Sequence, residues 1–204
     1  MTPALLLLAL GAGPSPRIER RDVLHSSDGN LTVWNYDSGL GDAELPDWIT
    51  TVRWVDIDRI HEAIFDEESG RLGWVEAIGV FETPRGVVYL LVSEDQQSPT
   101  EFVTILTALR AGNGALVEAA GFFPPRFPGT NQRRSVVAWT YSRRPGIDLW
   151  PRPVEIVIDE DEKRFDVGVS RAGKDAAFAL ELRGDGLVAV GLAAGVLEPL
   201  SGAL

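Results

Sequence analysis

Tight turns that recur between short apolar runs are the feature that most constrains this chain. Beyond residue 135, strand-like runs cover residues 136–141, 154–158, 165–169, 177–182 and 187–192. Turn-forming sequences separate the later runs, among them Gly184-Asp185-Gly186. Short strands with turns every eight to twelve residues or so are typical of an antiparallel meander. We therefore expect the second half of the chain to be an antiparallel β meander.

The first half predicts strands with a single helix. Ser98-Pro99-Thr100-Glu101 has the form of a capping box with proline at the first helical position. Phe102, Ile105, Leu106 and Leu109 follow at helical spacing, and Gly112 is a candidate for the position that ends a helix. The expected fold is therefore α+β, in which a bent antiparallel sheet packed by one helix precedes the β meander.

Turn sequences also predict a hairpin loop and a second turn in the first half. Pro84-Arg85-Gly86 separates the apolar run 72–81 from the run 87–92. The polar, glycine-ended segment 66–70 separates Ile60–Phe65 from Leu72–Phe81, which is typical of a hairpin loop.

Four segments are expected along the chain. Residues 1–16 form an apolar N-terminal segment, residues 17–123 an α+β domain, residues 124–134 a proline-rich connection, and residues 135–204 an all-β meander. The run Ala4–Leu10 is interpreted as a signal peptide or as a tail, and it is too short to cross a membrane as a helix. We expect no membrane span.

Part of the first half resembles a known family. The step Trp54-Val55-Asp56-Ile57 enters a hairpin, the strands that follow end at Val92-Ser93-Glu94-Asp95, and the segment 101–109 would close the sheet as a helix. This order, over residues 31–111, resembles small bacterial proteins with a pleckstrin-homology-like fold. The resemblance implies a binding or scaffolding fold without intrinsic catalysis.

Composition excludes several kinds of site. The chain has no cysteine, which removes disulfides, thiolate metal sites and cysteine nucleophiles. His25 and His61 are the two histidines, too few for a typical catalytic zinc site, and we expect no cofactor. The formal net charge of −11 disfavours binding to nucleic acid over the surface as a whole. Phosphoinositide binding is also not expected, because the segment 37–47 carries acidic but no basic residues.

One segment departs from the acidic character of the chain. Residues 121–153 contain six arginines and one aspartate, with aromatic residues between them. Arginine, tryptophan and tyrosine are enriched at protein-binding hot spots, and arginine beside aromatic rings also suits nucleic acid. Pairing with the chain's own carboxylates is a third interpretation. The candidate binding residues are Arg126, Arg133, Arg134, Trp139, Tyr141, Arg143, Arg144, Trp150 and Arg152.

Two further groups of residues are candidates for catalysis. Asp56, Asp58 and Glu62 lie near His61, which allows a carboxylate- or metal-dependent hydrolase. Asp22 and Asp28 lie near His25 in the sequence, and Ser26 and Ser27 follow it, although no Gly-x-Ser-x-Gly motif is present to expose a serine nucleophile.

The absence of catalytic motifs favours one interpretation of function. We expect a soluble, non-enzymatic module that binds or scaffolds another protein, in an unknown oligomeric state. The alternatives are the hydrolase, a nucleic-acid or polyanion binder acting through residues 121–153, and an acidic immunity-type protein that neutralises a basic partner. A cytoplasmic location is favoured over a secreted or periplasmic one, and a bacterial origin is expected.

Overall fold

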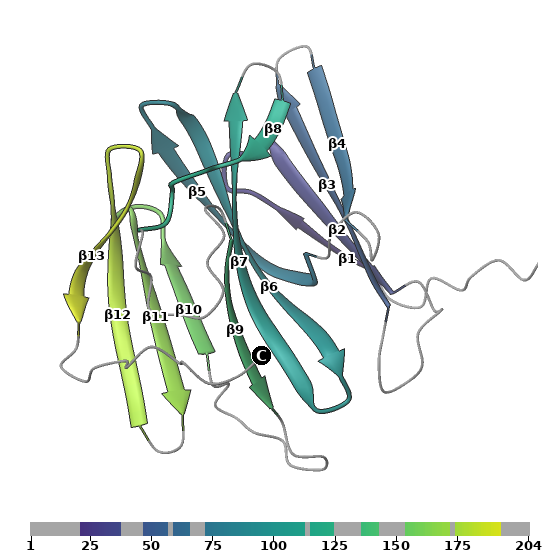
Figure 1. The fold of residues 1–204 in the computed structure, drawn as a ribbon. Coiled ribbons are helices and arrows are strands. Elements are labelled where there is room, and N and C mark those ends of the chain that lie inside the picture. Colours follow the sequence, from purple (N-terminus) through teal and green to yellow (C-terminus); the bar gives the residue numbers. More distant parts are fainter. Residues whose placement is uncertain are drawn as a thin grey trace, which may run out of the picture.

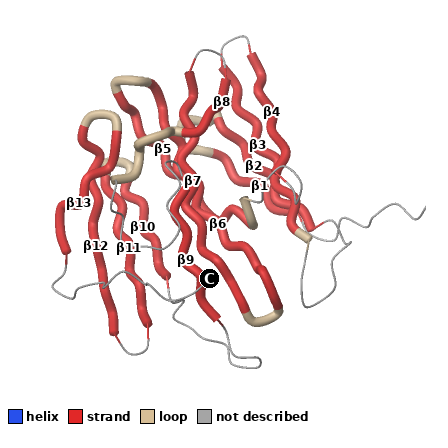
Figure 2. The backbone as a smooth tube through the Cα atoms, in the orientation of Figure 1, coloured by secondary structure: helices blue, strands red, loops and turns tan. Residues whose placement is uncertain are grey.

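The computed structural model is built from strands (Figure 1). It describes residues 21–37, 47–56, 59–65, 72–112, 115–124, 136–142, 154–171 and 174–192. Figure 2 shows strands and loops throughout this part of the chain, and no helix. The described residues thus contain no helix that could span a membrane.

The strands form three antiparallel sheets. Sheet A contains β1 (Arg21–His25), β2 (Leu31–Asp37), β3 (Trp48–Asp56) and β4 (Arg59–Phe65) in that order. Sheet B contains β5 (Trp74–Thr83), β6 (Gly86–Ser98), β7 (Glu101–Gly112), β8 (Ala115–Glu118) and β9 (Val136–Ser142). Sheet C contains β10 (Val154–Asp159), β11 (Arg164–Arg171), β12 (Lys174–Arg183) and β13 (Gly186–Leu192) in that order.

Sheet B is the middle layer of the molecule. In Figure 1 it stands between sheet C on the left and sheet A on the right. Its strand β7 pairs with β6 on one edge, and the other edge is divided between β8, opposite residues 109–112, and β9, opposite residues 101–107. Residues 136–142 therefore share a sheet with strands of the first half of the chain.

Alternate residues of β6 enter two separate cores. Val88, Leu90 and Val92 pack in a core with sheet C, whereas Tyr89 and Leu91 pack in a core with sheet A. Successive side chains of a strand point to opposite faces, so a nearly continuous apolar run fits a sheet that is covered on both sides. Burial on both faces explains the continuous apolar run of β6 from Val87 to Val92.

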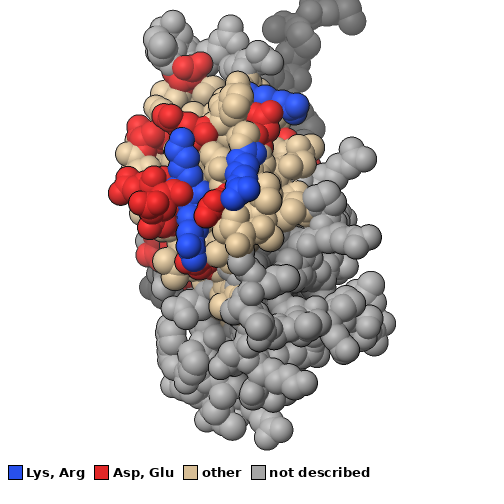
Figure 3. Space-filling model, turned by 90° about the vertical axis from the view of Figure 1, so that its left-hand side faces the viewer, with Lys and Arg blue, Asp and Glu red and all other residues tan. Residues whose placement is uncertain are grey.

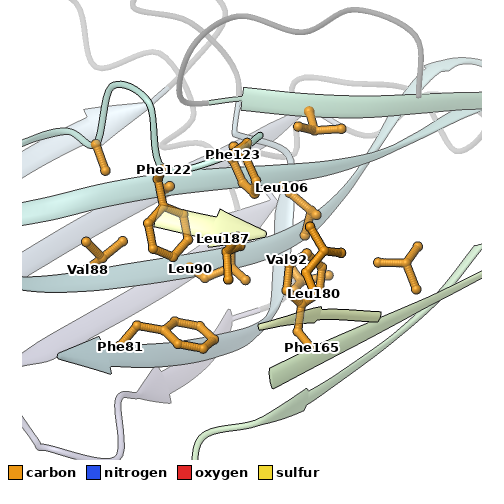
Figure 4. Packing of buried hydrophobic residues seen from close by; sticks show 14 of the residues in the cluster. Phe81, Val88, Leu90, Val92, Leu106, Phe122, Phe123, Phe165, Leu180 and Leu187 are labelled. Atoms are coloured by element: carbon orange, nitrogen blue, oxygen red, sulfur yellow. The ribbon is translucent and has the colours of Figure 1, made fainter. Parts of the chain in front are cut away.

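The core between sheets B and C is apolar and partly aromatic. Phe81 and Phe122 lie with their ring centroids 5.8 Å apart, and Figure 4 shows them beside Leu90 and Leu187. Phe165 from β11 is fully buried in the same core. The segment after β8 brings Phe122 there, and the N–H of Leu187 donates to the carbonyl of Phe122 at 2.7 Å.

The helix expected after Ser98 is absent, because residues 101–112 form β7. The prediction of an α+β fold is therefore wrong, and the described part of the chain is all-β. The apolar residues that suggested helical spacing instead lie on both faces of a strand buried on both sides. Val103, Thr104, Ile105 and Thr107 are β-branched and favour a strand. Residues 99–100 make a tight turn, where the N–H of Thr100 lies 3.4 Å from the hydroxyl of Ser98.

The second turn and the hairpin predicted in the first half have different outcomes. The turn at residues 84–85 joins β5 to β6 as expected. Gly86 fits this turn because its φ is +115° and a side chain there would meet the carbonyl oxygen of Ala111. The hairpin expected across residues 66–70 is wrong, because β4 pairs with β3 in sheet A and β5 pairs with β6 in sheet B.

The predicted meander at the end of the chain is confirmed for sheet C. Its four strands pair in chain order, with β12 and β13 joined across Gly184 and Asp185. Gly184 has a φ of +63°, which suits the tight turn expected there.

Candidate functional site

The outer face of sheet A carries Val23, Val55 and Ile60, three of the six exposed large hydrophobic residues among those that the structure describes. On β2 and β3 the residues that alternate with buried Val33 and Val52 point away from sheet B. Strand pairing places their neighbours on β1 and β4 on the same side. We define the sheet A face by its outward residues Val23, Trp34, Tyr36, Ile49, Arg53, Val55, Ile60 and Glu62.

Aliphatic side chains on this face are strongly exposed. Val23 is 44% exposed, Val55 40% and Ile60 62%. Val55 and Ile60 lie directly opposite each other on β3 and β4, so they form one continuous apolar spot. Trp34 and Tyr36 are partly buried on the adjoining strand. Exposed apolar residues that adjoin one another mark surfaces that bind other molecules.

Hydrogen bonds on the inner side hold sheet A against sheet B. Asn35 is fully buried, and its amide donates to the carbonyl of Val75 at 2.7 Å and accepts from the N–H of Val75 at 3.1 Å. The hydroxyl of Thr50 donates to the carbonyl of Gly73 at 2.7 Å. These bonds satisfy backbone groups at the start of β5, next to the register shift between Val75 and Ala77.

A second polar group links the β1–β2 turn to β6. The hydroxyl of Tyr89 donates to Asp28 at 2.8 Å, and the hydroxyl of Ser26 donates to the other carboxylate oxygen at 2.5 Å. Burial by itself would raise the pKa of Asp28, but these hydrogen bonds and those from Asn30 outweigh it and hold the pKa below its ordinary value. Burial, and then the acceptor Asp28, raise the pKa of Tyr89. The cluster therefore contains an ionised Asp28 and a neutral Tyr89, and its hydrogen bonds hold the β1–β2 turn against β6.

The outer face of sheet C has the opposite character. Figure 3 looks at the side of the molecule where sheet C lies and shows acidic and basic side chains interspersed. Arg164 pairs with Asp166 at 2.9 Å and Arg183 with Glu181 at 3.4 Å. Val157 is 55% exposed, but its neighbour in register on β11 is Asp166. Apolar side chains are therefore separated by charges on this face.

Most of the predicted arginine and aromatic site lies outside the described residues. This holds for Arg126, Arg133, Arg134, Arg143, Arg144, Trp150 and Arg152. The backbone of Trp139 and Tyr141 lies in β9, opposite Thr104 and Phe102 of β7. The binding role of this segment stays a prediction.

Among the described residues, those proposed for a hydrolase lie on both faces of sheet A. His61 and Glu62 are consecutive in β4, so their side chains point to opposite faces of sheet A. Asp56 is the last residue of β3, and Asp58 lies outside the described residues. Within the part of the chain that the structure describes, no group of three or more His, Asp or Glu side chains could hold a metal ion.

His25 and its neighbours do not form a nucleophilic relay. The hydroxyl of Ser26 is bonded to Asp28 and to the carbonyl of Leu31, whereas the Nδ1 atom of His25 lies 3.2 Å from the hydroxyl of Thr32. Ser26 is buried and His25 is exposed. The arrangement closes the β1–β2 turn.

Sequence reasoning missed the sheet A face. The sequence signal for this face is that apolar residues stand at both odd and even positions of β2 and β3. The residues are Leu31, Val33 and Trp34 on β2, and Val52, Trp54 and Val55 on β3. Such a strand is either buried on both sides or presents an apolar outer face.

Comparisons with known proteins assign no family. No family model, curated protein or solved structure matches this chain. The resemblance to pleckstrin-homology-like proteins stays a prediction, and the helix expected to close that fold is replaced by β7.

Proposed function

We propose that this chain is a non-enzymatic module that binds another protein through the sheet A face. The observation that carries the proposal is the pair Val55 and Ile60, exposed and adjacent on the outer side of a sheet whose inner side is fixed by buried hydrogen bonds. Trp34, Tyr36 and Arg53 lie on the same face, and these residue types dominate the energetics of protein interfaces. A rigid apolar face of this kind binds without the entropic cost of ordering a loop.

The test compares two outward-facing surfaces of the same protein. Val55→Asp with Ile60→Asp places carboxylates on the sheet A face where β3 ends and β4 begins, and Val157→Asp makes the same change on the outer face of sheet C. Each variant is crosslinked at native abundance, and the crosslinked residues are mapped by mass spectrometry. We expect a stoichiometric partner that crosslinks to strands β1–β4 with the wild type and with Val157→Asp, and that is lost with the double variant.

Recovery of the same partner by the double variant would contradict the proposal. All three positions are exposed, but each variant sets two carboxylates opposite each other across neighbouring strands, which should cost about 1 kcal/mol or less. Thermal unfolding of both variants therefore serves as the folding control. Charge reversal at Arg143 and Arg144 in the same experiment tests the predicted arginine segment independently.

A further inference from the structure

Two pairs of residues on β3 and β4 form adjoining rows on the sheet A face. Arg53 lies opposite Glu62, and Val55 lies opposite Ile60. All four side chains point outward, away from sheet B. We call these four residues the β3–β4 seam. It therefore places a row of opposite charges beside a row of exposed aliphatic side chains.

The two charged residues of the seam do not pair with each other. No ion pair joins Arg53 to Glu62, although they are neighbours across the two strands. The Nε of Arg53 is buried and has no hydrogen-bond partner among the residues that the structure describes. Arg53 as a whole is only partly buried, so a carboxylate brought to this face from outside would form a charge-assisted hydrogen bond with its guanidinium.

A second copy of the chain carries the complementary pattern. Consider a two-fold axis that lies in the plane of contact, parallel to the strands and midway between β3 and β4. Such an axis places Arg53 against Glu62 of the second copy, and Glu62 against its Arg53. The same operation places Val55 against Ile60 of the second copy, so that apolar side chains meet apolar side chains. A two-fold interface must be self-complementary, and this seam meets that condition in both rows.

We infer that the occupant of the sheet A face is a second copy of this chain, docked face to face along the β3–β4 seam. This inference rests on the proposed function and specifies the partner. The chain as a whole carries a formal charge of −11, so two copies repel each other over most of their surfaces. The seam holds one positive and one negative side chain, and there the electrostatic contact is attractive.

The test measures molar mass by sedimentation equilibrium for the wild type, Arg53→Glu, Glu62→Arg and an equimolar mixture of the two variants. The wild type should show about twice the chain mass of 22.2 kDa. Each variant alone opposes like charges at both contacts, and its dimer should weaken at least about tenfold. In the mixture the two variants should form a heterodimer, because each then offers the charge that the other lacks.

The mixture also serves as the folding control, since recovery requires both variants to be intact. Asp166→Arg, a charge reversal on the outer face of sheet C, should leave the dimer unchanged. A wild-type monomer, a dimer that neither seam variant weakens, or a mixture that stays monomeric would each overturn the inference. A monomer that still binds a different protein through the sheet A face would leave the proposed function standing, so the two failures are distinguishable.

Discussion

Sheets A and C each pack an apolar core against one face of sheet B, but they place polar and exposed apolar residues differently. Sheet C buries the apolar Phe165 and Leu180 toward sheet B and carries paired charges on its outer face. Its turns add polar contacts to sheet B, where the N–H of Val80 donates to Glu160 at 2.7 Å and Arg85 pairs with Asp185 at 2.9 Å. Sheet A also buries apolar residues toward sheet B, but Ser26, Asn35 and Thr50 are buried among them, and Val55 and Ile60 are exposed on its outer side. The buried polar residues of sheet B that face sheet A are Ser93, Asp95 and Thr107.

This difference shows that the residue types buried on each face of a sheet depend on what packs against that face. Sheet C has the pattern of a sheet that ends at solvent. On sheet A the directional hydrogen bonds of Asn35 fix its register against β5, while apolar contacts remain available on the other side. The inner contacts of sheet A thus determine position, and its outer face is free to contribute binding energy.

The largest expected effect comes from the apolar core beside sheet C. Phe165→Ala removes a fully buried ring and should lower the free energy of unfolding by about 3–5 kcal/mol. Chemical denaturation measures the change. If Phe165→Ala lowered the free energy of unfolding by less than a sheet A substitution does, the view that apolar burial mainly holds sheet C in place would be contradicted.

A smaller loss is expected from the polar side of sheet A. Asn35→Ala leaves the N–H and carbonyl of Val75 without their side-chain partners and should cost about 1–3 kcal/mol. Thr51→Val, on the outer side of the neighbouring strand, is the matched control and should change little. Equal effects of the two substitutions, measured by thermal unfolding, would show that the buried amide does not fix sheet A.

The tie between Asp28 and Tyr89 predicts a dependence on pH. Tyr89→Phe removes one donor to the carboxylate and should cost about 1 kcal/mol at neutral pH. Because the folded pKa of Asp28 lies below its ordinary value of 3.8, its contribution is present above that value and is lost as the pH falls through the folded pKa. The difference between the two proteins should therefore shrink in acid, and denaturation curves over this range check it. A gap that widens in acid would contradict the assignment.

The smallest effect belongs to the exposed charges of sheet C. Arg164→Ala removes an ion pair whose side chains are 45% and 46% exposed, so solvent already screens it. We expect no resolvable shift of the thermal midpoint. A shift as large as that of Tyr89→Phe would indicate that the charges on the outer face of sheet C are structural.

The sequence was sufficient to predict sheet C, because turn residues such as Gly184 and Asp185 mark the ends of its strands locally. It was misleading for β7, since a strand buried on both faces has apolar residues at both parities and can match helical spacing. The change of sheet between β4 and β5 depends on packing between distant segments, which no local pattern records. The sheet A face was missed for the same reason, because the outer exposure of Val55 depends on what the rest of the chain leaves uncovered.

The division of the β7 edge has a consequence for the order of folding. Every other strand pair in the described part of the chain joins neighbours in sequence, so these pairs form by closing short loops. Only β9 must return across the residues between β8 and β9 to reach β7. Loop-closure entropy slows contacts between distant residues, so the β7–β9 pairing carries the greatest such cost in sheet B. Sheets A and C can each form as local hairpins before that pairing is complete.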